Sequence, residues 1–128
     1  MSDPSFSVEG FHHVQLAMPP GSEPDAEAFY AGVLAFEIVP KPEHLAARGG
    51  RWFRSGTTEL HLGVEDGFRA STKSHPALRI RGLDALRARV EAAGLAVEDD
   101  TQLDEHERWY VRDPFGNRLE LIEEVSNR

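Results

Sequence analysis

Residues 113–121 read Asp-Pro-Phe-Gly-Asn-Arg-Leu-Glu-Leu, a tight turn followed by an alternating strand. Pro114 fixes its own φ, and Gly116 can adopt the positive φ that such a turn requires. Because side chains alternate along a strand, Arg118 and Glu120 fall on one face and the two leucines on the other. The stretch therefore predicts a hairpin whose last strand has one polar and one apolar face.

The rest of the chain has one order of elements twice. The first half predicts a strand, a helix, a strand, an irregular loop and a hairpin, over residues 11–17, 22–34, 36–39, 41–50 and 51–64. The second half predicts a strand, a helix that stops at Gly94, a strand, an acidic loop and the hairpin, over residues 76–81, 83–94, 95–98, 99–105 and 107–123. The sequence thus predicts an α+β fold made of two βαβββ modules, residues 8–66 and 75–124, within a single domain, 1–128.

The two halves also agree in the spacing of their histidines and glutamates. His13 and Glu59 are 46 residues apart, and His75 and Glu120 are 45 residues apart. Alternation puts all four on the polar faces of the predicted sheets, and it puts His61 on the same face as Glu59. Two imidazoles with one or two carboxylates form a divalent-metal site, suited to Fe, Mn, Co, Ni or Zn.

Composition excludes several other classes of function. The chain has 128 residues, no cysteine and a formal net charge of −8. An acidic chain lacks the positive field that nucleic acids or anionic membranes require, and no apolar run approaches the roughly 20 residues of a membrane span. The first four residues have neither a basic patch nor an apolar core, so no secretory signal is expected. We expect an acidic cytoplasmic protein with a small-molecule substrate.

Four segments resemble one known superfamily: His13-Val14-Gln15-Leu16, Glu59-Leu60-His61-Leu62, His75-Pro76-Ala77-Leu78 and residues 113–121. They are similar to the vicinal-oxygen-chelate proteins, which include glyoxalase I, bleomycin resistance proteins and extradiol dioxygenases. The resemblance implies paired modules that curl into a half-barrel around a divalent metal ion, usually within a homodimer. It also implies chemistry in which the metal chelates two adjacent oxygens of the substrate.

The resemblance assigns metal ligands residue by residue. His13, His75 and Glu120 match three ligands of the metal-dependent members. The fourth ligand is either Glu59, which matches the glyoxalase I carboxylate, or His61, two residues further along the strand. If three ligands suffice, Glu59 is a candidate general base, and proton transfer by Glu59 or Glu120 is expected in lyase or isomerase chemistry.

Other residues of the ligand face have candidate roles beside the metal. Tyr110 matches an acid–base tyrosine of the extradiol dioxygenases, although an aromatic residue there is also expected for packing. Arg79 and Arg118 are candidates to receive an anionic group of the substrate. Gln15 stands where fosfomycin enzymes use a threonine and is assigned to substrate binding.

Three departures leave the reaction open. Glyoxalase I has an arginine where this chain has Ala17 and an asparagine where it has Gly63, and fosfomycin enzymes have a tyrosine where it has Lys73. The sequence therefore favours a glyoxalase-like lyase or isomerase, or a small dioxygenase, without choosing between them. The alternatives are a metal-free protein that binds a drug or metabolite, and a polar face that has no ligand. Both a site within one chain and a site across a dimer fit the pattern.

Overall fold

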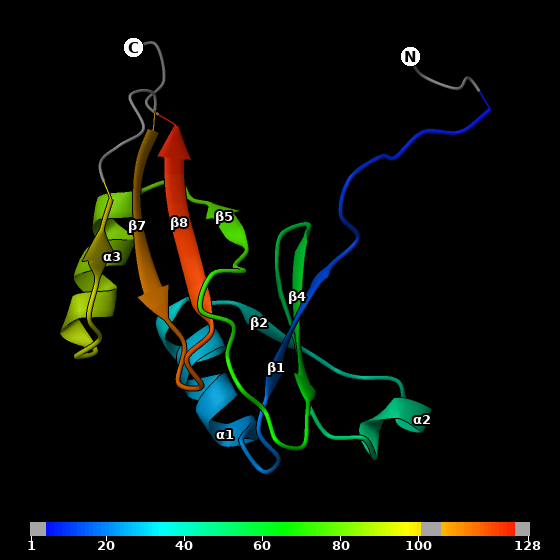
Figure 1. Ribbon diagram of the computed structural model, residues 1–128. Coiled ribbons are helices and arrows are strands. Elements are labelled where there is room, and N and C mark those ends of the chain that lie inside the picture. Colours follow the sequence, from blue (N-terminus) through cyan, green and yellow to red (C-terminus); the bar gives the residue numbers. More distant parts are fainter. Residues whose placement is uncertain (1–4, 101–105, 125–128) are drawn as a thin grey trace.

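Two four-stranded sheets form the framework of the protein (Figure 1). The structure is a computed structural model and describes residues 5–100 and 106–124. Sheet order is β1-β4-β3-β2 and β5-β8-β7-β6, and in each sheet the first strand pairs in parallel with the last. The strands are β1 (Val14–Met18), β2 (Glu37–Val39), β3 (Arg51–Ser55), β4 (Thr58–Val64), β5 (Ala77–Arg79), β6 (Glu98–Asp99), β7 (His106–Arg112) and β8 (Arg118–Glu124). The predicted α+β fold of two βαβββ modules is confirmed.

Helices connect the strands of each half. The expected first helix is α1 (Glu23–Ala26), continued by the π-helix η1 (Glu27–Val33). The wider turn of η1 is closed by the Leu34 amide, which donates to the Phe29 carbonyl at 3.0 Å. The second half has the expected helix, α3 (Leu83–Ala92), which ends before Gly94.

Several boundaries differ from the expectation. The stretch 41–50, predicted to be a loop, contains the short helix α2 (Glu43–Ala46), because the Pro42 carbonyl accepts from two following amides. Strand β1 starts at Val14 rather than at residue 11, since its register with β4 begins with Val14 opposite Leu60. Strand β5 is shorter than predicted, and β6 is shorter and begins at Glu98 rather than at residue 95, so that Asp99, expected in the acidic loop, belongs to the strand. Residues 1–4, where no signal is expected, and residues 101–105 of the expected acidic loop lie outside the described residues.

A common core joins the two sheets. The apolar faces of both sheets and the buried side of η1 contribute to one cluster, which includes Phe29, Tyr30, Phe53, Leu60, Leu62, Val111, Leu119 and Leu121. Each such side chain contributes about 1.5–3 kcal/mol when it is fully buried. Burial of the alternate residues leaves the polar rows on the opposite face of each sheet, where the candidate site residues lie.

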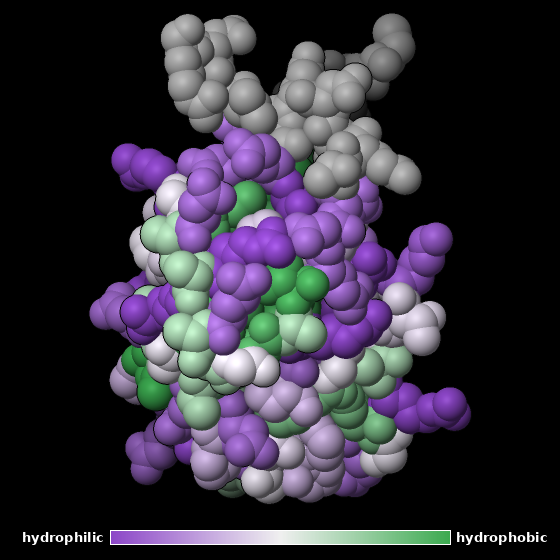
Figure 2. All heavy atoms as spheres, turned by 90° about the vertical axis from the view of Figure 1, so that its left-hand side faces the viewer, coloured by the Kyte–Doolittle hydropathy of each residue, from purple (hydrophilic) through white to green (hydrophobic). Residues whose placement is uncertain are grey.

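The outer surfaces differ in character. The face over α3 and β6 is mixed, with hydrophilic side chains around a hydrophobic patch near its middle (Figure 2). The segment before β1 extends away from both sheets (Figure 1), and Phe6, Val8 and Phe11 in it are exposed. Among the described residues, no helix has the length and apolarity needed to cross a membrane.

Candidate metal centre

The polar face of the first sheet carries His13, Glu59 and His61. The register of β3 with β4 sets Trp52 opposite His61, and the two rings stack with centroids 4.3 Å apart. His13 stacks near His61 at the same centroid distance of 4.3 Å. The Nε2 atom of His61 is 3.2 Å from Oε1 of Glu59. Alternation along β4 thus brings both candidates for the fourth ligand into contact with each other.

Burial favours the neutral form of the His61 imidazole. Loss of solvation is the largest influence on the pKa of His61 and lowers it, whereas the Glu59 carboxylate raises it; the net change is a lowered pKa. His13 and His12 lower the pKa further, since a charge on one imidazole disfavours a charge on its neighbour. A neutral imidazole is the form that binds a metal ion.

The polar face of the second sheet carries His75 and Glu120. The Nδ1 atom of His75 is 2.8 Å from the Lys73 carbonyl. A carbonyl oxygen can only accept, so Nδ1 carries the hydrogen and donates it. In the neutral ring, Nε2 then has a lone pair, and this atom is 2.9 Å from Oε1 of Glu120. A lone pair and a carboxylate oxygen facing each other require a cation, either a proton or a metal ion.

Two arginines, Arg108 and Arg118, lie near His75 and Glu120. Nη1 of Arg108 donates to Oε2 of Glu120 at 3.2 Å, and its Nη2 donates to Asp100 at 3.0 Å. Arg118 lies over the ring of Tyr110, 3.8 Å from the centroid, and Tyr110 meets the His75 ring edge-on at 5.4 Å. Sequence reasoning missed Arg108, although alternation puts it on the face of Tyr110 and could have indicated it.

Gln15 and Arg79 occupy different surroundings. Gln15 lies opposite His61 in the register of β1 with β4. A side chain added at Gly63 would approach within 2.7 Å of the Gln15 amide, so Gln15 fills the space above Gly63. The Arg79 side chain is 81% exposed and pairs with Glu124 at 3.1 Å. The structure therefore brings Arg118, but not Arg79, to the histidine–glutamate pair.

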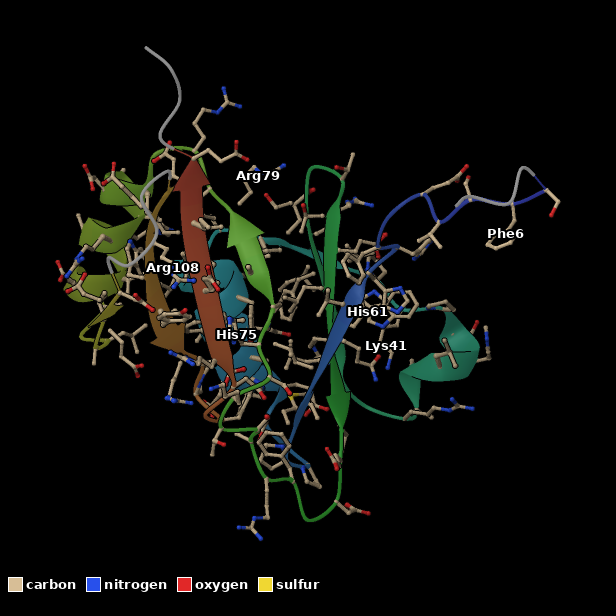
Figure 3. All side chains as sticks on the ribbon, turned by 45° about the horizontal axis from the view of Figure 1, so that its top comes forward. Phe6, Lys41, His61, His75, Arg79 and Arg108 are labelled. Carbon is tan, nitrogen blue, oxygen red and sulfur yellow. The ribbon has the colours of Figure 1, made fainter. Side chains whose placement is uncertain are left out.

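The candidate ligands form two separate groups in one chain. Figure 3 shows His61 on the first sheet and His75 beside the second. Glu120 belongs to β8 of the second sheet. Over residues 5–100 and 106–124, no three histidine or acidic groups gather where they could hold one metal ion. The expected convergence of both halves on one point is not present within the single chain.

A groove separates the two groups. Its volume is about 490 Å³, and its lining includes Gln15 and Leu16 of β1, His75 and Pro76 before β5, and Arg118 at the start of β8. The groove follows the edge of β1 that does not pair with β4. It is therefore open to a further sheet edge or to a ligand.

Fold and residue pattern together agree with one family. Residues 22–122 match the family described as Glyoxalase-like domain. The chain belongs to this glyoxalase-like family, within the vicinal-oxygen-chelate superfamily. Among curated proteins, none matches the chain.

Solved structures show the same fold. A protein of Bacillus anthracis described as a member of the glyoxalase family is 41% identical, with a TM-score of 0.90 over 93% of this chain and 98% of that chain. A glyoxalase family protein of Enterococcus faecalis is 21% identical, with a TM-score of 0.72 over 90% and 98%. The fosfomycin resistance protein FosX of Listeria monocytogenes, in complex with Mn(II) and sulfate, is 17% identical, with a TM-score of 0.74 over 92% of each chain. The last two show a shared fold alone.

Proposed function

We propose that this protein is a metal-dependent enzyme, a glyoxalase-like lyase or isomerase or a small dioxygenase, acting on a small substrate with adjacent oxygens. His13, His75 and Glu120 are assigned as metal ligands, and Glu59 or His61 as the fourth. The ion is Fe, Mn, Co, Ni or Zn, since this donor set suits each of them. The FosX structure that shares this fold contains Mn(II).

One observation carries the proposal: the contact of His75 with Glu120. Metal-binding histidines commonly donate their second ring hydrogen to a backbone carbonyl, which fixes the tautomer and the ring orientation. His75 does so toward Lys73, and its other nitrogen points at Oε1 of Glu120. Arg108 holds the second oxygen of this carboxylate. These residues fit one half of a divalent-metal site.

The other half comes, in our proposal, from a second copy of the chain. Strand β1 pairs only with β4, and β5 only with β8, so each has one free edge within the described chain. A twofold dimer in which β1 of one copy lies beside β5 of the other would join His13 to His75 and Glu120. Two equivalent sites per homodimer result. The groove along β1 provides the room for this pairing.

The chain's own residues then orient the substrate and move a proton. A divalent ion bound here supplies Lewis-acid polarisation of two adjacent substrate oxygens. Glu59 is half-buried beside His61, and it would take the proton from the carbon next to a substrate carbonyl. If Glu59 is instead the fourth ligand, Glu120 is the carboxylate that moves the proton. Tyr110 and Arg118 form a wall beside His75.

Metal analysis of untagged protein tests this function. We expect near-stoichiometric Fe, Mn, Co, Ni or Zn by plasma mass spectrometry in the wild type. The His75→Ala variant should lose the metal, whereas His44→Ala, at an exposed histidine of α2, should keep it. Protein that is empty and also fails to take up added metal would contradict the proposal. Loaded protein should then be assayed with 2-oxoaldehydes and catechols.

A further inference from the structure

A second cavity lies on the polar face of the first sheet, next to the group formed by His13, Glu59 and His61. Its volume is about 210 Å³. Gln15 and Trp52 form part of its floor, and Lys41, Arg48 and Gly49 come from the segment that contains α2. The segment predicted to be an irregular loop therefore forms one wall of a cavity beside the candidate site.

Trp52 connects the cavity to His61, which does not itself line it. Trp52 lines the cavity and also stacks on the His61 ring, with centroids 4.3 Å apart. Figure 3 shows Lys41 on the side of the first sheet that carries His61. A small molecule whose reacting end lies at the histidines can therefore reach this cavity with its other end.

Two cations line the cavity. The Lys41 ammonium donates to the Gly49 carbonyl, which uses one of its three N–H groups and leaves two for a ligand. Arg48 is exposed, and in the part of the chain that the structure describes it has no ion pair.

Two acidic groups near the cavity, Glu23 and Glu27, are already engaged. The Glu23 carboxylate accepts from the Gly50 amide at 2.9 Å, and this bond, more than any charge, lowers its pKa. Glu27 pairs with Arg51 at 2.6 Å. The lining itself holds two basic side chains and no acidic one. In a chain with a net charge of −8, such a local excess of positive charge favours an anion.

We propose that this cavity binds an oxyanionic group of the substrate, a carboxylate, phosphonate or phosphate, through Lys41 and Arg48. The inference rests on the proposed function for the position of the reacting end, but anion binding by the cavity does not depend on a metal. The cavity is smaller than the roughly 300–1,000 Å³ of a typical ligand pocket. It therefore suits one compact charged group rather than a whole cofactor. Lys41 and Arg48 are specificity-determining residues in this proposal.

Titration with inorganic phosphate tests the proposal. The full chain is dialysed free of metal so that phosphate cannot bind a metal ion. It is titrated at low ionic strength by calorimetry and by tryptophan fluorescence, to which Trp52 at the cavity and the buried Trp109 both contribute. We expect saturable binding that weakens with added KCl. Lys41→Gln and Arg48→Gln should each lower the affinity about tenfold, because each removes a charged hydrogen bond. Arg81→Gln, at an exposed arginine outside the cavity, should leave the affinity unchanged.

Metal uptake, measured on the same preparations, separates the two proposals. If the two cavity variants bind phosphate more weakly but keep the wild-type metal content, both the anion-binding proposal and the metal-site proposal are supported. If none of the proteins takes up metal but only the cavity variants lose phosphate, the cavity proposal stands and the proposed enzyme function fails. Absence of phosphate binding by the wild type, or equal affinity in all variants, would overturn the cavity proposal. Equal thermal midpoints would show that the variants are folded.

Discussion

The Tyr30 hydroxyl donates a 2.6 Å hydrogen bond to Oδ2 of Asp113, which joins the π-helix of the first half to the β7–β8 turn of the second. Oδ1 of Asp113 accepts from the backbone amides of Phe115 and Asn117. The Asn117 amide group also donates to the Ala17 carbonyl at the end of β1. The turn before Glu120 is therefore attached to both η1 and β1.

Removing this hydroxyl should destabilise the protein. Tyr30→Phe leaves a buried carboxylate oxygen with one donor fewer, and we expect a loss of about 1–2 kcal/mol in the free energy of unfolding. Tyr110→Phe is the matched control, since no hydrogen bond from its hydroxyl is seen within the described residues. Urea unfolding of the three proteins measures the difference. An equal loss of unfolding free energy in both variants would contradict the stabilising role given to the Tyr30–Asp113 hydrogen bond.

The same contact predicts a pH dependence. Burial, and then the Asp113 carboxylate, raise the pKa of Tyr30 well above its ordinary value of 10.0. The pKa of Tyr30 is higher in the folded state than in the unfolded state. The stabilisation that the Tyr30–Asp113 hydrogen bond gives the folded state is therefore intact below about pH 10 and is lost as the pH rises toward the folded-state pKa. Measured by urea unfolding between about pH 8 and pH 11, the free energy of unfolding of the wild type should fall with rising pH, and that of Tyr30→Phe should fall less steeply. The same pH dependence of the free energy of unfolding in both proteins would contradict this prediction.

Arg108 is expected to orient Glu120 for metal binding. Arg108→Gln removes the donor to Oε2 of Glu120, and the loss of such a supporting contact lowers metal affinity by about 10–100-fold. Arg79→Gln is the control, because Arg79 is on the same sheet but 81% exposed. Competition with a fluorescent chelator gives both affinities. The prediction fails if the two substitutions have the same effect.

Mixing two inactive variants distinguishes a site across a dimer from a site within one chain. His13→Ala and Glu120→Gln should each abolish metal binding. After subunit exchange in an equimolar mixture, half of the dimers are mixed and each of these has one intact site, so about one quarter of the metal sites return. A site within one chain would return none. Metal content before and after exchange gives the answer.

Gly50 should tolerate a side chain poorly. Gly50 has φ of 90°, and an added Cβ would lie 2.5 Å from the Leu62 carbonyl oxygen. Gly82 has φ of 84° and nothing within 4 Å of an added Cβ. We expect Gly82→Ala to cost about 1–2 kcal/mol from its left-handed backbone, and Gly50→Ala about 1–3 kcal/mol more, because the strand must shift. Thermal or urea unfolding checks the order, and a smaller loss at Gly50 would refute it.

The order of elements and the faces of the strands could be predicted from the sequence, because alternation and turn chemistry are local properties. The leucines of β4 and β8 are buried as expected, and Glu59 and His61 share the opposite face. The role of 41–50 could not be predicted, since α2 depends on a proline cap and its place over β3 depends on packing.

The relation between the two halves also lies beyond local patterns. His13 and His75 have equivalent positions in the two modules, yet one chain keeps them in separate groups. The spacing of residues along a chain does not determine which sheet edges meet. The contact of Arg108 with Glu120 could not be predicted from local patterns either, because it depends on the pairing of β7 with β8 as well as on side-chain length.

The contact between Gln15 and Gly63 has a consequence for sequence variation in the family. The Gln15 amide occupies the volume that any side chain at position 63 would enter, with a closest approach of 2.7 Å. A relative with a larger residue at the position of Gly63 must therefore have a shorter or differently directed residue at the position of Gln15. We expect the two positions to covary, so that each family member fills this part of the sheet from one strand or from the other.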